Sequence, residues 1–108
     1  MADLSVEVER TGGVVVVRLG GDLDKLTAPR LGDCLSGLVR EGEVEFVIDA
    51  ARLSFCDSSG LWVLVEHQRR VDARQGRLRL TGVHGVLLRV LDVTGLRAAF
   101  DVALPAQL

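Results

Sequence analysis

The chain has 108 residues, of which 48 % are hydrophobic and only 2 are prolines, and its formal net charge at pH 7 is −2. This length suits one domain, which would bury about 65 % of the surface that the unfolded chain exposes, and the composition argues against disorder. The charge gives no electrostatic reason to expect nucleic acid or an acidic membrane surface as a partner.

The N-terminal part of the sequence predicts a β-hairpin. Apolar and polar residues alternate over residues 4–8, which is typical of a half-buried strand. A turn follows at Thr11-Gly12-Gly13, and the apolar residues 14–19 form the partner strand. Gly20 and Gly21 are expected to end that strand.

An amphipathic helix and a buried strand come next. The helix begins near Thr27 or Ala28, accommodates Pro29 in its first turn and ends at Glu41-Gly42. The apolar residues that mark this helix are Leu26, Leu31, Leu35, Leu38 and Val39. The nearly continuous apolar run over residues 44–48 indicates a strand covered on both faces, at the centre of a sheet.

The second half of the sequence predicts two further helices and two further strands. A helix spans Ser58 to about Ala73, a strand spans residues 77–81, and a helix spans residues 84–93 with a glycine at its stop. A short edge strand is expected over residues 100–103. The apolar residues expected to face the core are Leu61, Leu64, Val65, Val86 or Leu87, Val90 and Leu91. The order of elements predicts an α/β fold with a mixed, largely parallel sheet of four or five strands and three or four flanking helices.

The most informative motif is Asp57-Ser58-Ser59-Gly60, which lies at the start of the helix predicted from Ser58. The backbone amides of the first helical turn have no partner within the helix, so Asp57 or Ser58 can cap them. The same free amides favour a phosphate group. From these residues alone the motif indicates either a well-capped helix or a regulatory serine.

Three sequence blocks carry a family likeness. They are Gly21-Asp22-Leu23-Asp24 followed by Thr27-Ala28-Pro29, then Val47-Ile48-Asp49 running through Phe55 to Asp57-Ser58-Ser59-Gly60-Leu61, and Arg89-Val90-Leu91-Asp92-Val93-Thr94-Gly95-Leu96. In these blocks the chain resembles the STAS domain family, named for sulphate transporters and anti-sigma factor antagonists. Within it, the chain is most similar to the short, free-standing bacterial antagonists. The likeness covers nearly the whole chain, so residues 1–108 are expected to form a single STAS domain.

The resemblance implies partner switching as the mechanism. An unphosphorylated antagonist binds an anti-sigma factor that is itself a serine kinase, and this frees a sigma factor for transcription. The kinase phosphorylates the serine after the aspartate, here Ser58, which separates the complex, and a serine phosphatase resets it. The phosphate is expected to act at the interface by bulk and charge without unfolding the helix. The residues expected to bind the partner are Asp22, Asp24, Asp57, Ser58, Ser59, Gly60 and Trp62.

Several alternatives remain open at this point. An enzyme is disfavoured because Cys56 stands where a nucleophile elbow has glycine, and because only His67 and His84 could act as imidazole bases. A STAS scaffold or transport-complex subunit without a phospho-switch, or a nucleotide sensor, keeps the fold. Ser59 is a second possible acceptor, and Trp62 is either a residue at the edge of the core or an interface anchor.

The cysteines and the termini bear on the cellular compartment. Cys34 and Cys56 lie far apart in the sequence, in no metal-like or redox-like spacing, which predicts reduced thiols. Cys56 is expected to be a small buried hydrophobe. The apolar runs are too short to cross a bilayer, and the first residues do not resemble a secretion signal. We therefore expect a soluble, cytoplasmic protein without a metal, a cofactor or a catalytic residue.

Overall fold

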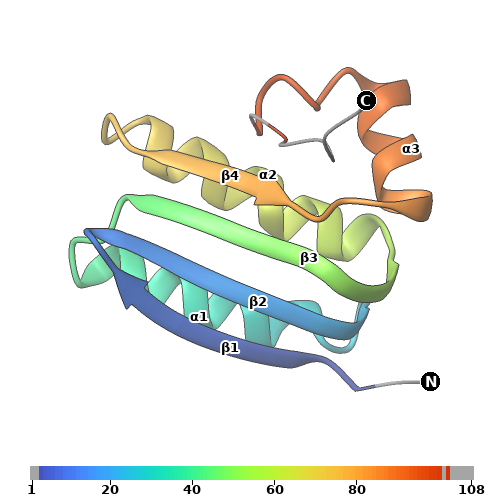
Figure 1. Ribbon diagram of the computed structural model, residues 1–108, viewed down its shortest axis with the longest axis horizontal. Coiled ribbons are helices and arrows are strands. Elements are labelled where there is room, and N and C mark those ends of the chain that lie inside the picture. Colours follow the sequence, from blue (N-terminus) through green and yellow to red (C-terminus); the bar gives the residue numbers. More distant parts are fainter. Residues whose placement is uncertain (1–2, 101, 103–108) are drawn as a thin grey trace.

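A four-stranded sheet forms the centre of the fold, and three helices pack beside it (Figure 1). The computed structural model describes residues 3–100 and residue 102. In chain order the elements are β1 (Ser5–Thr11), β2 (Val14–Leu23), α1 (Ala28–Arg40), β3 (Glu45–Cys56), α2 (Ser58–Asp72), β4 (Arg77–Thr81) and α3 (Gly85–Thr94).

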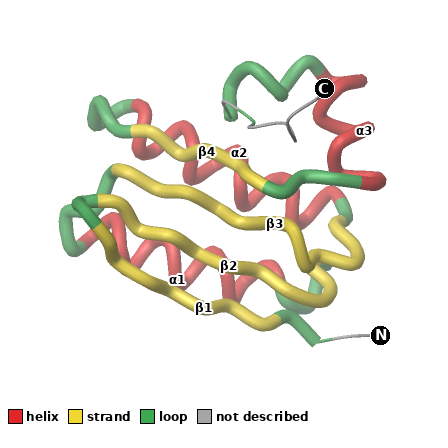
Figure 2. The backbone as a smooth tube through the Cα atoms, viewed as in Figure 1, coloured by secondary structure: helices red, strands yellow, loops and turns green. Residues whose placement is uncertain are grey.

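The sheet is mixed, with the strand order β1-β2-β3-β4. β1 and β2 form an antiparallel hairpin, whereas β2, β3 and β4 run parallel to one another. The two parallel connections need crossovers, which α1 and α2 provide. Figure 2 shows both helices behind the sheet, on the same face, and α3 beyond the end of β4. The predicted α/β fold with a mixed, largely parallel sheet is confirmed.

The core lies between the sheet and the helices. Alternate strand residues point into it, as the period of two requires, and so do the apolar faces of the helices. Its fully buried members include Val17, Leu19, Leu31, Leu35, Phe46, Ile48, Leu64, Val71, Leu80 and Leu91. On α3 the core residue is Leu87, since Val86 is 60 % exposed. In the described part of the chain, no helix has both the length and the apolar character that crossing a bilayer requires.

Leu26 is a correction to the predicted helix face. Its side chain is 78 % exposed, because it lies in the turn before α1 and outside the helical periodicity. The residues of α1 that do face the core are Ala28, Leu31, Leu35, Leu38 and Val39. Leu26 is therefore an apolar side chain displayed on the surface.

The two central strands are longer than the sequence predicts. β2 continues through Gly20 and Gly21 to Leu23, with shifts of register against β3 on either side of this pair. Gly21 has a φ of 83°, which a glycine adopts without strain, so the strand bulges there instead of ending. β3 likewise extends to Cys56, beyond the predicted apolar run. The prediction that the glycines end β2 is wrong, because bulges preserve the pairing.

The predicted edge strand over residues 100–103 has no counterpart among the described residues. Phe100 closes a turn after α3, and its carbonyl accepts a hydrogen bond of 3.3 Å from the Leu80 amide. Residues 101 and 103 lie outside the described residues. Phe100 is 1 % exposed, so this segment packs against the edge of β4 through one backbone contact and one buried side chain.

Candidate functional site

The extended strands β2 and β3 bring two helix starts together at one edge of the sheet. Leu23 pairs with Cys56 as the last residues of these parallel strands (Figure 1). Each strand is followed by a helix, so the starts of α1 and α2 lie side by side. The Asp57 amide donates a hydrogen bond of 3.1 Å to the Leu23 carbonyl, which continues the contact beyond the sheet.

Asp57 is the residue that caps α2. Its backbone is extended, and its carboxylate Oδ1 accepts hydrogen bonds from the amides of Ser59 at 2.8 Å and Gly60 at 3.1 Å. Its other oxygen, Oδ2, accepts from the Lys25 amide at 3.1 Å. One carboxylate thus satisfies first-turn amides of α2 and ties the β2–α1 loop to them.

The β2–α1 loop is held by Asp24 and Thr27. Asp24 Oδ1 accepts from the amides of Leu26 at 2.9 Å and Thr27 at 3.1 Å. The Thr27 hydroxyl donates to the Asp22 carbonyl at 2.8 Å. Asp22 and Asp24 are only 9 % and 8 % exposed. Sequence reasoning placed both aspartates on the surface beside Ser58, but the exposed side chains of this loop are those of Lys25 and Leu26.

Gly60 is required by close packing against the end of β2. A Cβ atom there would lie 2.6 Å from Leu23 Cγ and 2.9 Å from the Leu23 carbonyl oxygen. We therefore predict that Gly60→Ala lowers the free energy of unfolding by about 1–3 kcal/mol through overpacking. Gly32, in α1, is the matched control, since a Cβ there has its nearest neighbour at 3.9 Å.

Urea unfolding of both variants tests this prediction. Gly32→Ala should be neutral or should stabilise the protein by up to about 1 kcal/mol, because alanine restricts the unfolded chain. Equal unfolding midpoints for Gly60→Ala and the wild-type protein would show that the start of α2 can move away from β2.

Ser58 is the first residue of α2, and its side chain is exposed. The amides of Ser59 and Gly60 are already occupied by Asp57, so the hydroxyl is not needed as a cap. Of the two interpretations of the motif, the cap belongs to Asp57 and the serine hydroxyl is left accessible for chemistry.

Cavities lie on both sides of this helix start. A groove of about 380 Å³ between α1 and α2 includes Ser59 and Trp62 in its lining. Trp62 is 56 % exposed and lies under the Arg69 guanidinium, 5.8 Å from the ring centroid. The side chain is thus not part of the core. A second cavity, of about 230 Å³, lies between α2 and α3 and includes Ser58 in its lining.

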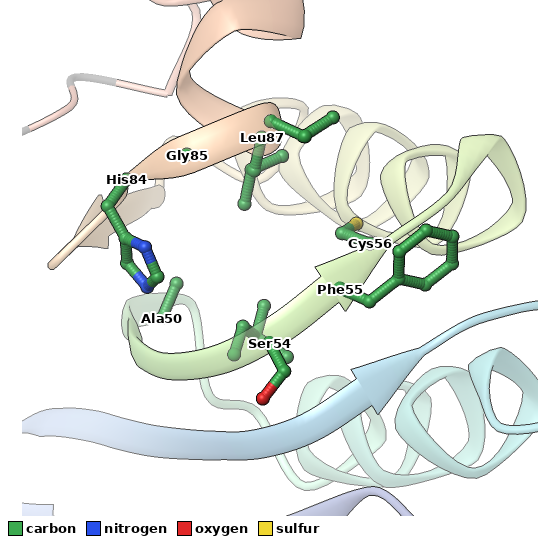
Figure 3. Close-up of a pocket in the computed structure, with 9 residues that line it drawn as sticks. Ala50, Ser54, Phe55, Cys56, His84, Gly85 and Leu87 are labelled. Carbon is green, nitrogen blue, oxygen red and sulfur yellow. The ribbon is translucent and has the colours of Figure 1, made fainter. Parts of the chain in front are cut away.

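A smaller cavity of about 60 Å³ adjoins the second one, between the last part of β3 and the start of α3. Figure 3 shows His84 and Leu87 on one side of it, and Ala50 and Cys56, from β3, on the other. Burial, with a smaller contribution from the Asp57 carboxylate, raises the pKa of the Cys56 thiol to about 12. At neutral pH the thiol is therefore protonated and suits an apolar wall.

Neither histidine is hydrogen-bonded to Ser58. His67 is 2 % exposed between α1 and α2, where its Nδ1 donates to the Val63 carbonyl at 2.8 Å and its Nε2 lies 2.9 Å from the Ser36 hydroxyl. His84 Nε2 donates to the Ala51 carbonyl at 3.1 Å. Within the described residues, no group of three or more His, Cys, Asp or Glu side chains is arranged to hold a metal ion.

Comparison with known proteins follows from this geometry. The family model described as "Mlab, STAS domain" matches residues 6–104. The chain is 30 % identical over 95 residues to an anti-sigma F factor antagonist of Paenibacillus polymyxa, covering 87 % of this chain and 81 % of that protein. It is 29 % identical over 105 residues to an anti-sigma-B factor antagonist of Bacillus subtilis (strain 168), covering 97 % of this chain and 95 % of that protein.

Solved structures of antagonists have the same fold. The unphosphorylated form of the anti-sigma factor antagonist SpoIIAA matches with a TM-score of 0.72 and 28 % identity over 82 % of each chain. The phosphorylated form of the Bacillus SpoIIAA matches with a TM-score of 0.77 and 27 % identity over 93 % of this chain and 92 % of that one. An antagonist from Mycobacterium paratuberculosis gives a TM-score of 0.83 and 27 % identity over 93 % and 85 % of the two chains.

Proposed function

The chain belongs to the STAS domain family, and we propose that it is an anti-sigma factor antagonist controlled by phosphorylation of Ser58. The observation that carries this proposal is the exposed hydroxyl of Ser58 directly after the capping residue Asp57. The similarity to an antagonist whose solved structures include a phosphorylated and an unphosphorylated form supports it.

In the proposed cycle the unphosphorylated protein binds an anti-sigma factor of the serine-kinase type, and this binding frees a sigma factor. The kinase transfers the γ-phosphoryl group of ATP to Ser58 Oγ, whose proton is released, and ADP leaves. A serine phosphatase hydrolyses the phosphate ester and returns the protein to its binding form. The residues proposed to take part in binding are Asp22, Asp24, Asp57, Ser58, Ser59, Gly60 and Trp62.

These residues contribute in different ways. Ser58 and the exposed Trp62 offer side chains to the partner, and Trp is enriched among the residues that dominate interface energies. Asp57 and Gly60 fix the position of the helix start against β2. Asp22 and Asp24 shape the loop that displays Lys25 and Leu26.

The charge of the phosphate accounts for release of the partner. Phosphorylation adds about −1.5 to −2 charge at neutral pH. The nearby Asp57 carboxylate is negative and already uses two first-turn amides, so the phosphate meets repulsion there and finds fewer free donors than a bare helix start offers. The change is local to the docking surface, which leaves the core intact.

Binding, and not catalysis, is the proposed activity, because the His67 and His84 rings are engaged with other groups. We also propose that residues 1–108 act as one domain in the cytoplasm. The sheet and the three helices share one cluster of buried apolar residues, which supports a single unit.

Phosphopeptide mapping tests the proposal. The purified chain is incubated with the anti-sigma serine kinase of the same organism and ATP, and the products are mapped by mass spectrometry. We expect one phosphate, on Ser58, and none in a Ser58→Ala variant. A phosphate found only on Ser59 would move the switch by one residue, and no phosphate with unimpaired kinase would favour a STAS scaffold or transport-complex subunit.

A further inference from the structure

The cavity between the start of α2 and α3 has an uneven lining. It is lined by Cys56, Asp57, Ser58, Leu61, Leu87 and Val90. The side chains from α2 and α3 that face it are apolar, and the Cys56 thiol is protonated at neutral pH because its pKa is raised. The polar residues are the two neighbours Asp57 and Ser58, of which Ser58 is exposed. The cavity is thus an apolar pocket with the serine at its rim, which we call the α2–α3 pocket.

The size of the α2–α3 pocket suits one large apolar side chain. Its volume is about 230 Å³, whereas an apolar cavity of about 150 Å³ admits benzene. Water gains little there, since a buried water needs about two to four polar partners and this lining offers few. An apolar group that displaces such water would gain affinity.

The occupant follows from the position of Ser58. A kinase that phosphorylates this residue must bring the γ-phosphate of ATP into contact with Ser58 Oγ, which lines the pocket itself. The surface of that kinase therefore covers the pocket mouth whenever it engages the serine. No other partner in the proposed cycle has to make this approach while the protein is unphosphorylated.

We propose that the α2–α3 pocket receives one apolar side chain of the kinase-type anti-sigma factor, and that a phosphate on Ser58 prevents this insertion. The proposal rests on the proposed function and adds a physical target for the switch. A phosphate at the rim must keep its hydration, and an apolar side chain entering beside it would strip that water away. The negative charge of Asp57 on the same rim adds to the effect.

Filling the pocket from α3 tests the proposal. Val90, on the pocket wall, is partly buried, whereas Val93 lies three residues further along the same helix and is 81 % exposed. Val90→Phe should weaken binding to the purified anti-sigma serine kinase by about 10- to 100-fold, the effect of losing one buried apolar contact. Val93→Phe, the matched control, should change the dissociation constant by no more than about twofold.

A second variant and a combined variant guard against indirect effects. Val90→Ser adds no bulk and should also weaken binding, because it makes the wall polar, and circular dichroism reports whether either variant has lost its fold. In a Ser58→Glu background, Val90→Phe should cost almost nothing more, since both changes remove the same inserted side chain.

The outcomes separate the pocket from the function on which it rests. Wild-type binding and Ser58 phosphorylation, together with unchanged affinity of folded Val90→Phe and Val90→Ser, would overturn the pocket proposal and leave the proposed function standing. Equal weakening by Val90→Phe and Val93→Phe would also overturn it. If the wild-type chain neither binds the kinase nor accepts phosphate from it, both proposals fall.

Discussion

Ser58→Glu is expected to weaken binding of the kinase-type anti-sigma factor by more than about a hundredfold, which corresponds to a loss of about 3–4 kcal/mol. The glutamate places a negative charge beside Asp57 and at the rim of the α2–α3 pocket. Isothermal titration calorimetry with the purified kinase measures the effect. Because Ser58 is exposed at the start of α2, the fold should be retained.

Ser58→Ala is the matched variant for this prediction. The Asp57 carboxylate caps α2, so removal of the hydroxyl should leave the free energy of unfolding within about 0.5 kcal/mol of the wild-type value. The variant should bind the kinase and stay bound in the presence of ATP. Tight binding by Ser58→Glu would contradict the switch, and global unfolding of Ser58→Ala would show that the hydroxyl is mainly structural.

Periodicity predicted the regular parts of this fold well. The spacing of apolar residues located α2 and β4, since a helix with one buried face and a strand with alternating burial each leave a clear pattern. The left-handed Gly95 at the end of α3 was equally visible as a stop signal. These features depend on local geometry, which a sequence displays directly.

The site depends on contacts that a sequence does not display. Gly20 and Gly21 were expected to end β2, but bulges carry the strand on to Leu23, where its carbonyl meets the Asp57 amide. The burial of Asp24 is equally hidden, because an aspartate in a turn is usually exposed and here accepts two loop amides. Resemblance identified Ser58, whereas the pocket beside it requires α3 to be placed against α2.

Asp57→Ala is expected to lower the free energy of unfolding by about 2–3 kcal/mol. Loss of a helix cap costs about 0.5–2 kcal/mol, and the Lys25 amide loses its acceptor as well. Urea unfolding measures the change. The same variant should bind the kinase more weakly, because the β2–α1 loop with Lys25 and Leu26 is no longer held against α2.

Asp57→Asn separates the two roles of this carboxylate. Asparagine caps helices about as well as aspartate, so its side-chain oxygen can still accept from the amides of Ser59 and Gly60. Its NH₂ group then faces the Lys25 amide, and two donors cannot bond to each other. The variant should be more stable than Asp57→Ala, while hydrogen exchange at the Lys25 amide becomes faster and that at Ser59 and Gly60 stays slow.

Kinase affinity then decides which role matters for function. Weakened binding by a stably folded Asp57→Asn would mean that the partner reads the loop position, which Asp57 sets through Lys25. Wild-type affinity together with fast exchange at Lys25 would mean that the loop is dispensable and that the partner reads only the start of α2. Because Oδ1 and Oδ2 bond to different elements, one substitution removes one contact and leaves the other.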